Sequence, residues 1–342
     1  MKKKLLAMVS TMLVGTLLLT ACGGGGSDTE TTTTDTAASE ETDAGDDSSA
    51  SSSDIKIGMI VNDGSADTYQ TTYYTAAQEY AEELGVEIQL LDPKGDVATQ
   101  ANQVQDLINM NCDVIVIWPV NSESAVSSVK AVDDAGIPCL VANTPVVEEG
   151  LEYTVGFVGP SNVEEGKQSA QAMVDALGEG AKIVEITGQS GYSTTTERSS
   201  GMKEAVEAGG LEILDSQPGD GKRETSQQVM ENFLVKYAVG EVDAVFCFDD
   251  NTAFGAINAI EAVGREGDVK VYAAAAGDFS TVEYVREGRL SGIAMQSPII
   301  DAQTTLDFAV KVANGEEIEF YNYIETPVAT PDNIDTLEIE EW

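Results

Sequence analysis

Residues 113–143 read DVIVIWPVNSESAVSSVKAVDDAGIPCLVAN and contain two apolar runs, VIVIW and IPCLVA, separated by a segment of helical length. Each run is apolar along its whole length, which is typical of a strand that is buried on both faces of a sheet. Two such strands joined through a helix favour parallel pairing with a right-handed crossover. This stretch therefore predicts an α/β fold built on a parallel sheet.

The same pattern recurs on both sides of this stretch, and helical segments fill most of the gaps between the apolar runs. About 290 residues is large for one doubly wound sheet, so the pattern predicts two doubly wound parallel-sheet lobes. Strands are predicted at residues 55–61, 86–92, 113–119, 137–143, 153–159, 182–187, 211–217, 243–248, 269–275 and 291–296.

The N-terminal segment has the composition of an export signal. Residues 1–21 combine a basic start, MKKK, with an apolar run that is short for a membrane span. They end in LLTAC, which resembles the lipobox of bacterial lipoproteins and implies cleavage before a lipidated Cys22. The alternative is a plain signal, or a short helix, followed by a chance cysteine. Residues 22–54 lack aromatic and large aliphatic side chains after Cys22, so we expect a disordered acidic linker there.

The charge of the chain argues against binding to nucleic acid. Without the three lysines of the predicted signal, 15 basic residues remain against 59 acidic ones, a formal charge of −44. Such a surface repels a polyanion, and the sequence has no basic stripe. We expect most of these acids to lie on a solvated surface.

Histidine and cysteine usage narrows the possible chemistry. The chain has no histidine, which excludes Ser-His-Asp and Cys-His catalysis and most transition-metal sites. Cys112, Cys139 and Cys247 each lie in or beside an apolar run, so they are predicted to be core thiols without disulfide partners. No metal or other cofactor is expected.

Polar side chains follow several predicted strands at the edge where parallel sheets bind ligands. Amide, carboxylate and guanidinium groups can pair with sugar hydroxyls, and tyrosine rings can cover the apolar face of a sugar. The residues predicted to contact a solute are Asp67, Tyr69, Asn143, Tyr192, Arg198, Asp249 and Gln296.

From Ile55 to about Pro331 the chain resembles the type I periplasmic binding proteins of the ribose and galactose class. The resemblance rests on IKIGMIV at its start, on residues 92–143, on GQSGYSTTTERSSGM and on DAVFCFDDNTAFGAINAIEAVG. It implies two lobes that close on a solute through a hinge crossed three times by the chain. It also implies a lipid-anchored, extracytoplasmic, monomeric binding component of an ABC importer, which delivers a small sugar or sugar-like solute to a permease and its ATPase and is not an enzyme.

The resemblance also implies roles for single residues. Asn143 stands where many relatives have an aspartate that binds sugar hydroxyls, and Arg198 matches their ligand-binding arginine. Asp249 matches an asparagine or aspartate ligand, and Gln296 matches a glutamine ligand between the lobes.

Two positions depart from the family pattern. Residues 66–69 replace an Asn-Pro-Phe-Phe run, so one stacking ring is missing. Ala276-Gly277 replaces an Asp-Gly pair, and Asp278 lies two residues further on. The solute therefore stays open among pentoses, hexoses, autoinducer-2 and nucleosides.

The implied hinge crossings lie near residues 159–160, 296–297 and 325–326. They divide the chain into segments with different predicted roles. These are a lipoprotein signal at 1–21, the lipidated cysteine and linker at 22–54, an N-terminal lobe at 55–159 plus 297–325, and a C-terminal lobe and tail at 160–296 plus 326–342.

Other interpretations of these residues remain open at this point. Arg198 could form a surface ion pair with Glu197 or with a helix neighbour, and Asp249 could simply cap the helix that begins near Thr252. The same cleft could serve a chemoreceptor or sensor kinase in place of a permease. A carbohydrate-active enzyme would need two carboxylates across the cleft, and Asp67 with Asp249 is the pair that could supply them. The role of Trp118 is undecided.

Overall fold

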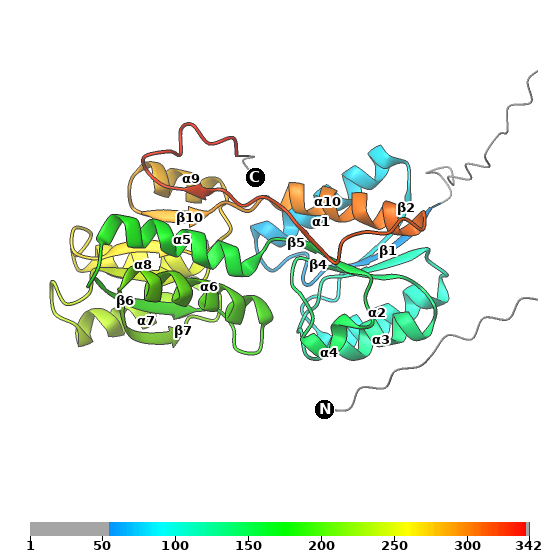
Figure 1. The fold of residues 1–342 in the computed structure, drawn as a ribbon, viewed down its shortest axis with the longest axis horizontal. Coiled ribbons are helices and arrows are strands. Elements are labelled where there is room, and N and C mark those ends of the chain that lie inside the picture. Colours follow the sequence, from blue (N-terminus) through cyan, green and yellow to red (C-terminus); the bar gives the residue numbers. More distant parts are fainter. Residues whose placement is uncertain (1–54, 340–341) are drawn as a thin grey trace, which may run out of the picture. The chain divides into compact units, whose positions relative to one another are not determined.

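The computed structural model describes residues 55–339 and 342, which form two six-stranded sheets (Figure 1). The strand orders are β11-β5-β4-β3-β1-β2 and β12-β10-β9-β8-β6-β7, and all neighbours are parallel except β12, which runs antiparallel to β10. This arrangement confirms the predicted fold of two doubly wound lobes. The first sheet contains β1 (Lys56–Ile60), β2 (Glu87–Leu91), β3 (Val114–Ile117), β4 (Cys139–Ala142), β5 (Gly156–Gly159) and β11 (Tyr321–Tyr323).

The continuous apolar runs are explained by helices on both faces of the first sheet (Figure 1). In β3, Val114 and Val116 belong to the core that includes Tyr73 of α1, whereas Ile115 and Ile117 belong to the core on the opposite face. Because alternate side chains face opposite sides, every position of the strand is buried. The helices of this lobe are α1 (Thr68–Leu84), α2 (Val97–Asn109), α3 (Val126–Asp134), α4 (Glu148–Leu151) and α10 (Pro298–Ala313).

The second sheet is built in the same way. Its strands are β6 (Lys182–Thr187), β7 (Glu212–Pro218), β8 (Ala244–Cys247), β9 (Lys270–Ala273), β10 (Gly292–Ala294) and β12 (Val328–Ala329). Ala244 and Phe246 of β8 pack with α5 and α6, whereas Val245 and Cys247 pack with α7 and α8. Its helices are α5 (Asn162–Leu177), α6 (Ser193–Gly209), α7 (Arg223–Lys236), α8 (Asp250–Ala262) and α9 (Phe279–Arg286).

The chain passes between the two sheets three times. It leaves the first sheet after β5, returns between β10 and α10, and leaves again between β11 and β12. All ten predicted strands are confirmed, most with shorter ends, whereas β6 has the predicted bounds and β7 is shifted by one residue. Strands β11 and β12 were not predicted because neither belongs to an apolar run of more than two residues. The lobe boundaries stay a prediction, which this sheet membership supports.

The three cysteines that lie in the described residues are free and buried, which confirms their assignment as core thiols. Among the helices of residues 55–339, none combines the length and the apolar character needed to cross a bilayer. The predicted signal, Cys22 and the linker lie outside the described residues.

Helices α5 and α6 approach each other so closely that glycine is required at their contact. A Cβ atom at Gly201 would overlap the carbonyl oxygen of Val163, and one at Gly166 would overlap the carbonyl oxygen of Arg198. Backbone atoms cannot swing aside as a side chain can, so the two helices would have to separate. This contact fixes the position of α6, which carries Arg198.

We predict that Gly201→Ala lowers the free energy of unfolding by about 1–3 kcal/mol, because the added methyl group forces the helices apart. Urea denaturation of the purified chain measures this loss. Gly267→Ala is the matched control, since nothing lies within 4 Å of a Cβ placed there. Equal stabilities of the two variants would contradict the close packing of α5 and α6.

Candidate functional site

Polar side chains from both lobes meet near the carboxyl ends of the strands. Tyr69 lies in the first turn of α1, Asn143 follows β4, and Gln296 follows β10. Arg198 lies in α6, the helix that follows β6. Hydrogen bonds connect these four predicted residues to one another and to two carboxylates that were not predicted from the sequence. We refer to the resulting six residues as the interlobe network.

The first of these carboxylates, Asp301, is completely buried in α10. Its Oδ2 atom accepts hydrogen bonds from Tyr69 Oη at 2.8 Å and from Asn143 Nδ2 at 2.7 Å. Burial raises the pKa of Asp301 to about 7, although the bonds from Asn143 and Tyr69 act in the opposite direction. Its Oδ1 atom is buried and has no hydrogen-bond partner among the described residues.

Gln296 joins the two halves of the interlobe network. Its Nε2 atom donates to Tyr69 Oη at 2.6 Å, and its Oε1 atom accepts from Arg198 Nη2 at 3.3 Å. Gln296 lies on the chain crossing between β10 and α10 and is 3% exposed. One amide group on the hinge therefore connects a tyrosine of the first lobe to an arginine of the second.

Arg198 is buried against a second carboxylate, Glu165 of α5. Its Nε atom donates to Glu165 Oε2 at 3.1 Å, its Nη1 atom donates to the Phe248 carbonyl at 3.3 Å, and its guanidinium lies 4.8 Å from the centre of the Phe248 ring. Because Arg198 is 7% exposed, the alternative of a surface ion pair with Glu197 is wrong. The guanidinium was predicted to bind a pair of solute oxygens. Its Nε, Nη1 and Nη2 atoms each donate a hydrogen bond to a protein group instead.

Glu165 has no exposed surface, and burial raises its pKa to about 7 even though the neighbouring Arg198 lowers it. Its Oε1 atom has no hydrogen-bond partner among the described residues. A sequence signal for Glu165 and Asp301 does exist. Each is an acid on the buried stripe of its helix, four residues before Ser169 and Thr305 respectively, which are also buried.

Tyr192 connects the loop before α6 to the first lobe. Its hydroxyl lies 2.8 Å from Thr144 Oγ1 and receives a hydrogen bond from Trp118 Nε1 at 3.5 Å. Thr144 Oγ1 also lies 3.2 Å from Thr194 Oγ1. The hydroxyl of Tyr192 therefore bonds to Thr144 and Trp118. The ring that carries this hydroxyl is the one predicted to cover a sugar.

Trp118 lies at the centre of an aromatic group at the end of β3. Its ring meets that of Tyr73 at 5.0 Å and that of Tyr69 at 6.1 Å, both edge to face, and Trp342 meets Tyr69 at 5.4 Å. Trp118 is 3% exposed. The residue left undecided by the sequence thus supports Tyr69 and donates to Tyr192.

Asp67 and Asp249 both cap helices. Asp67 accepts from the Gln70 backbone N–H at 2.8 Å, and Asp249 accepts from the Thr252 backbone N–H at 2.8 Å within a capping box. Burial raises the pKa of both carboxyls, against the hydrogen bonds of the caps. The capping interpretation of Asp249 is thereby confirmed, which leaves its second oxygen as the atom able to contact a solute.

Asp278 has a similar structural role at the start of α9. Its Oδ1 atom accepts from the Thr281 backbone N–H at 2.8 Å and from Thr281 Oγ1 at 3.0 Å. Ala276 has a φ of 89°, and its carbonyl accepts from the Gln296 backbone N–H at 3.1 Å. The carboxyl of Asp278 thus caps α9. It lies two residues after Ala276, which stands where the family pattern has an aspartate.

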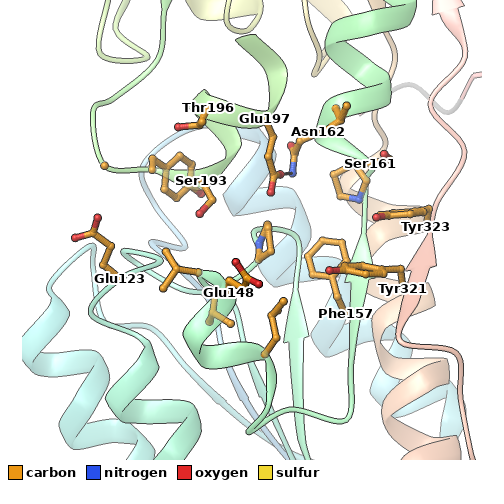
Figure 2. Close-up of a pocket in the computed structure, with 18 residues that line it drawn as sticks. Glu123, Glu148, Phe157, Ser161, Asn162, Ser193, Thr196, Glu197, Tyr321 and Tyr323 are labelled. Atoms are coloured by element: carbon orange, nitrogen blue, oxygen red, sulfur yellow. Dashed lines mark hydrogen bonds between the residues drawn. The ribbon is translucent and has the colours of Figure 1, made fainter. Parts of the chain in front are cut away.

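A cavity of about 650 Å³ lies beside the interlobe network (Figure 2). Residues of both lobes line it, including Phe157 and Glu148 from the first and Asn162 and Glu197 from the second. Of the seven predicted solute contacts, only Tyr192 borders it. The hydrogen-bonded network and this cavity are therefore two adjoining features of the interlobe region.

Over residues 55–339 and 342, no group of three or more acidic or cysteine side chains is placed to hold a metal ion. The interlobe network itself contains two carboxylates, and protein donors occupy one oxygen of each. The arrangement offers hydrogen-bond donors and acceptors to a polar ligand.

Comparison with known proteins identifies the family. A model of the periplasmic binding protein domain matches residues 57–317. The ribose import binding protein RbsB of Salmonella typhimurium is 30% identical over 243 residues, which cover 71% of this chain and 80% of that protein. The xylitol-binding protein of Mycolicibacterium smegmatis is 28% identical over 285 residues, with coverage of 83% and 79%.

Solved structures give the same result. An ABC transporter solute binding protein from Bacillus halodurans with bound myo-inositol is 31% identical, with a TM-score of 0.75 over 83% of this chain and 97% of that chain. A solute binding protein from Mycobacterium smegmatis with bound glycerol is 27% identical, with a TM-score of 0.75 and coverage of 84% and 98%. These matches confirm the resemblance inferred from the sequence, and the proteins they identify are binding proteins.

The burial of Asp301 predicts a pH dependence of stability. Its folded pKa, about 7, lies above the value near 3.9 of an unfolded aspartate, so the folded state binds more protons between these values. This contribution to stability is therefore present at low pH and is lost as the pH rises to 7. Asp301→Asn imitates the protonated acid, so its stability relative to wild type should rise by roughly 3 kcal/mol from pH 4.5 to pH 8.

Urea denaturation at several pH values measures this difference between the variant and the wild type. Asp307→Asn makes the same change in the same helix but lies outside the interlobe network, where it accepts from Tyr80 Oη at 3.0 Å. A constant difference between Asp301→Asn and wild type across this range would show that Asp301 titrates normally.

Proposed function

We propose, because this chain belongs to the periplasmic binding protein domain family, that it is the extracytoplasmic solute-binding component of an ABC importer. It captures a small sugar or sugar-like polyol between its lobes and delivers it to a permease. The observation that carries this proposal is the family match over residues 57–317, which spans both sheets and two of the three crossings. We also propose that the binding protein acts as a monomer.

The interlobe network supports a polyol as the solute. Its amide, hydroxyl, carboxylate and guanidinium groups alternate donors and acceptors, as a ring of hydroxyls requires. The seven residues of the sequence analysis remain the proposed solute contacts, with Arg198 acting partly by holding Gln296. Relatives named for ribose and xylitol, and one with bound myo-inositol, make these three compounds the first to test.

Closure of the lobes would give the permease a signal that the site is occupied. A solute that contacts both lobes binds the closed form better and so increases its population; periplasmic binding proteins are the standard example of hinge closure around a ligand. The same closure could inform a chemoreceptor or sensor kinase. Binding to a membrane-embedded permease, tested with the purified importer, distinguishes the transport function from this alternative.

A thermal-shift screen with ribose, xylitol and myo-inositol tests the solute class. A compound present at 100 times its dissociation constant should stabilise the chain by about 2.7 kcal/mol. The absence of any shift across a wide panel of sugars and polyols would refute the proposed solute class.

Arg198→Lys should weaken binding of the identified solute about 30-fold, because an ammonium cannot hold Gln296 and a solute oxygen in the geometry of a guanidinium. The variant also alters the contact between residue 198 and Glu165, which can lower the stability. Calorimetric titration well below the melting temperature measures the affinity separately from that loss. Arg289→Lys is the matched control, since Arg289 binds both oxygens of Glu261 in the second lobe, at 2.6 and 2.9 Å. Wild-type affinity in Arg198→Lys would assign this arginine to packing alone.

The lipid anchor is the final part of the proposal and rests on LLTAC and the acidic linker that follows it. Cys22→Ser should release the protein from the membrane fraction or leave it unprocessed, because no residue can then accept the lipid. A single acyl chain binds membranes only marginally, so multiple acylation would be needed for a stable anchor. Labelled fatty acid still incorporated by Cys22→Ser would disprove the anchor.

A further inference from the structure

The cavity beside the interlobe network has an aromatic side. Tyr321 and Tyr323 of β11 stack with their ring centres 5.7 Å apart and their planes 13° apart, and Phe157 packs 6.3 and 6.2 Å from them. The two tyrosines are 47% and 53% exposed. Figure 2 shows these three rings on one side of the cavity. The two tyrosine rings, backed by the buried Phe157, form an aromatic surface that a small ligand can reach.

The rest of the lining is apolar or neutral except for three carboxylates. Glu123 and Glu148 reach it from the first lobe and Glu197 from the second, and the lining includes no lysine or arginine. In Figure 2, the carboxylate of Glu197 enters from above and that of Glu148 lies below it. Glu197 accepts from Asn162 Nδ2 at 3.1 Å, and burial raises its pKa, so a nearby positive charge would favour its ionised form.

Helix N-termini at the cavity do not cancel this charge. The first turns of α5 and α6 border it, and each contributes roughly half a positive charge. Two helix ends therefore offset about one of the three carboxylates, and the one-turn α4 also begins at the cavity. Arg198 acts on Glu197 from outside the lining, but its charge is paired with the buried Glu165, so the net field favours a cation. The same net negative charge disfavours anions.

The cavity is suited to an organic cation more than to a metal ion. Among the described residues, no cluster of three or more acidic or cysteine side chains is placed to hold a metal ion. The faces of aromatic rings, in contrast, attract ammonium groups. A volume of about 650 Å³ is also within the range of pockets for small organic molecules.

We propose that this cavity is a second binding site, distinct from the proposed solute site, and that it takes a small organic cation between the tyrosines of β11 and the carboxylates of both lobes. The cation packs against the exposed rings of Tyr321 and Tyr323, with Glu148 and Glu197 balancing its charge. Because the lining comes from both lobes, an occupied site would also be coupled to their closure.

Choline and its neutral isostere 3,3-dimethylbutan-1-ol test this proposal, because the two differ in charge and hardly in shape. Choline, titrated by calorimetry at constant ionic strength and without any sugar, should bind saturably, and the isostere should bind at least about fivefold more weakly. No sugar is present, so the result is independent of the proposed transport function. Equal binding of the two compounds, or no saturable binding of choline, would overturn the cation site.

Variants distinguish the cavity from general attraction to an acidic protein. Tyr323→Leu should weaken choline binding about fivefold, whereas Tyr323→Phe keeps the ring and should restore it. Glu197→Gln should also weaken binding, and Glu207→Gln on the exposed side of the same helix should not. Equal effects of Glu197→Gln and Glu207→Gln would reduce the interaction to the net charge of the chain and refute the site.

Discussion

The need to provide partners for two buried carboxylates, one in each lobe, is the constraint on which the rest of the interlobe region depends. Glu165 and Asp301 have no exposed surface, and a buried carboxylate without partners is strongly unfavourable. Arg198 meets the first, Tyr69 and Asn143 meet the second, and Gln296 joins the two groups. The positions of α1, α5, α6 and α10 are consequently tied to one network.

Helix packing places the charges of this network. Gly166 and Gly201 let α5 and α6 approach closely, which brings Glu165 on α5 near Arg198 on α6. On the other side, α10 returns from the second lobe to pack beside α1 and so brings Asp301 to Tyr69. A fold with three crossings can place residues more than two hundred positions apart in sequence within hydrogen-bond distance.

The two interlobe features differ in their chemistry. The network is buried and hydrogen-bonded, and it offers paired polar groups of the kind that hydroxyls need. The cavity beside it is open to solvent, with aromatic rings on one side and three carboxylates among its other lining residues. Tyr192 borders both, since its hydroxyl bonds to Thr144 while its ring lines the cavity. Ligands at the two sites would therefore both lie next to Tyr192.

The fold class, ten of the strands and the polar strand ends could be predicted from the sequence alone, because apolar runs and helical periodicity are local properties of the chain. Strands β11 and β12 could not, since neither belongs to an apolar run of more than two residues and both exist through pairing with β5 and β10. The structure was needed to show that Arg198 binds Glu165, that Asp301 binds Tyr69 and Asn143, and that the tyrosines of β11 share a cavity with carboxylates of both lobes. Those contacts join segments far apart in sequence, and their geometry depends on how the helices pack.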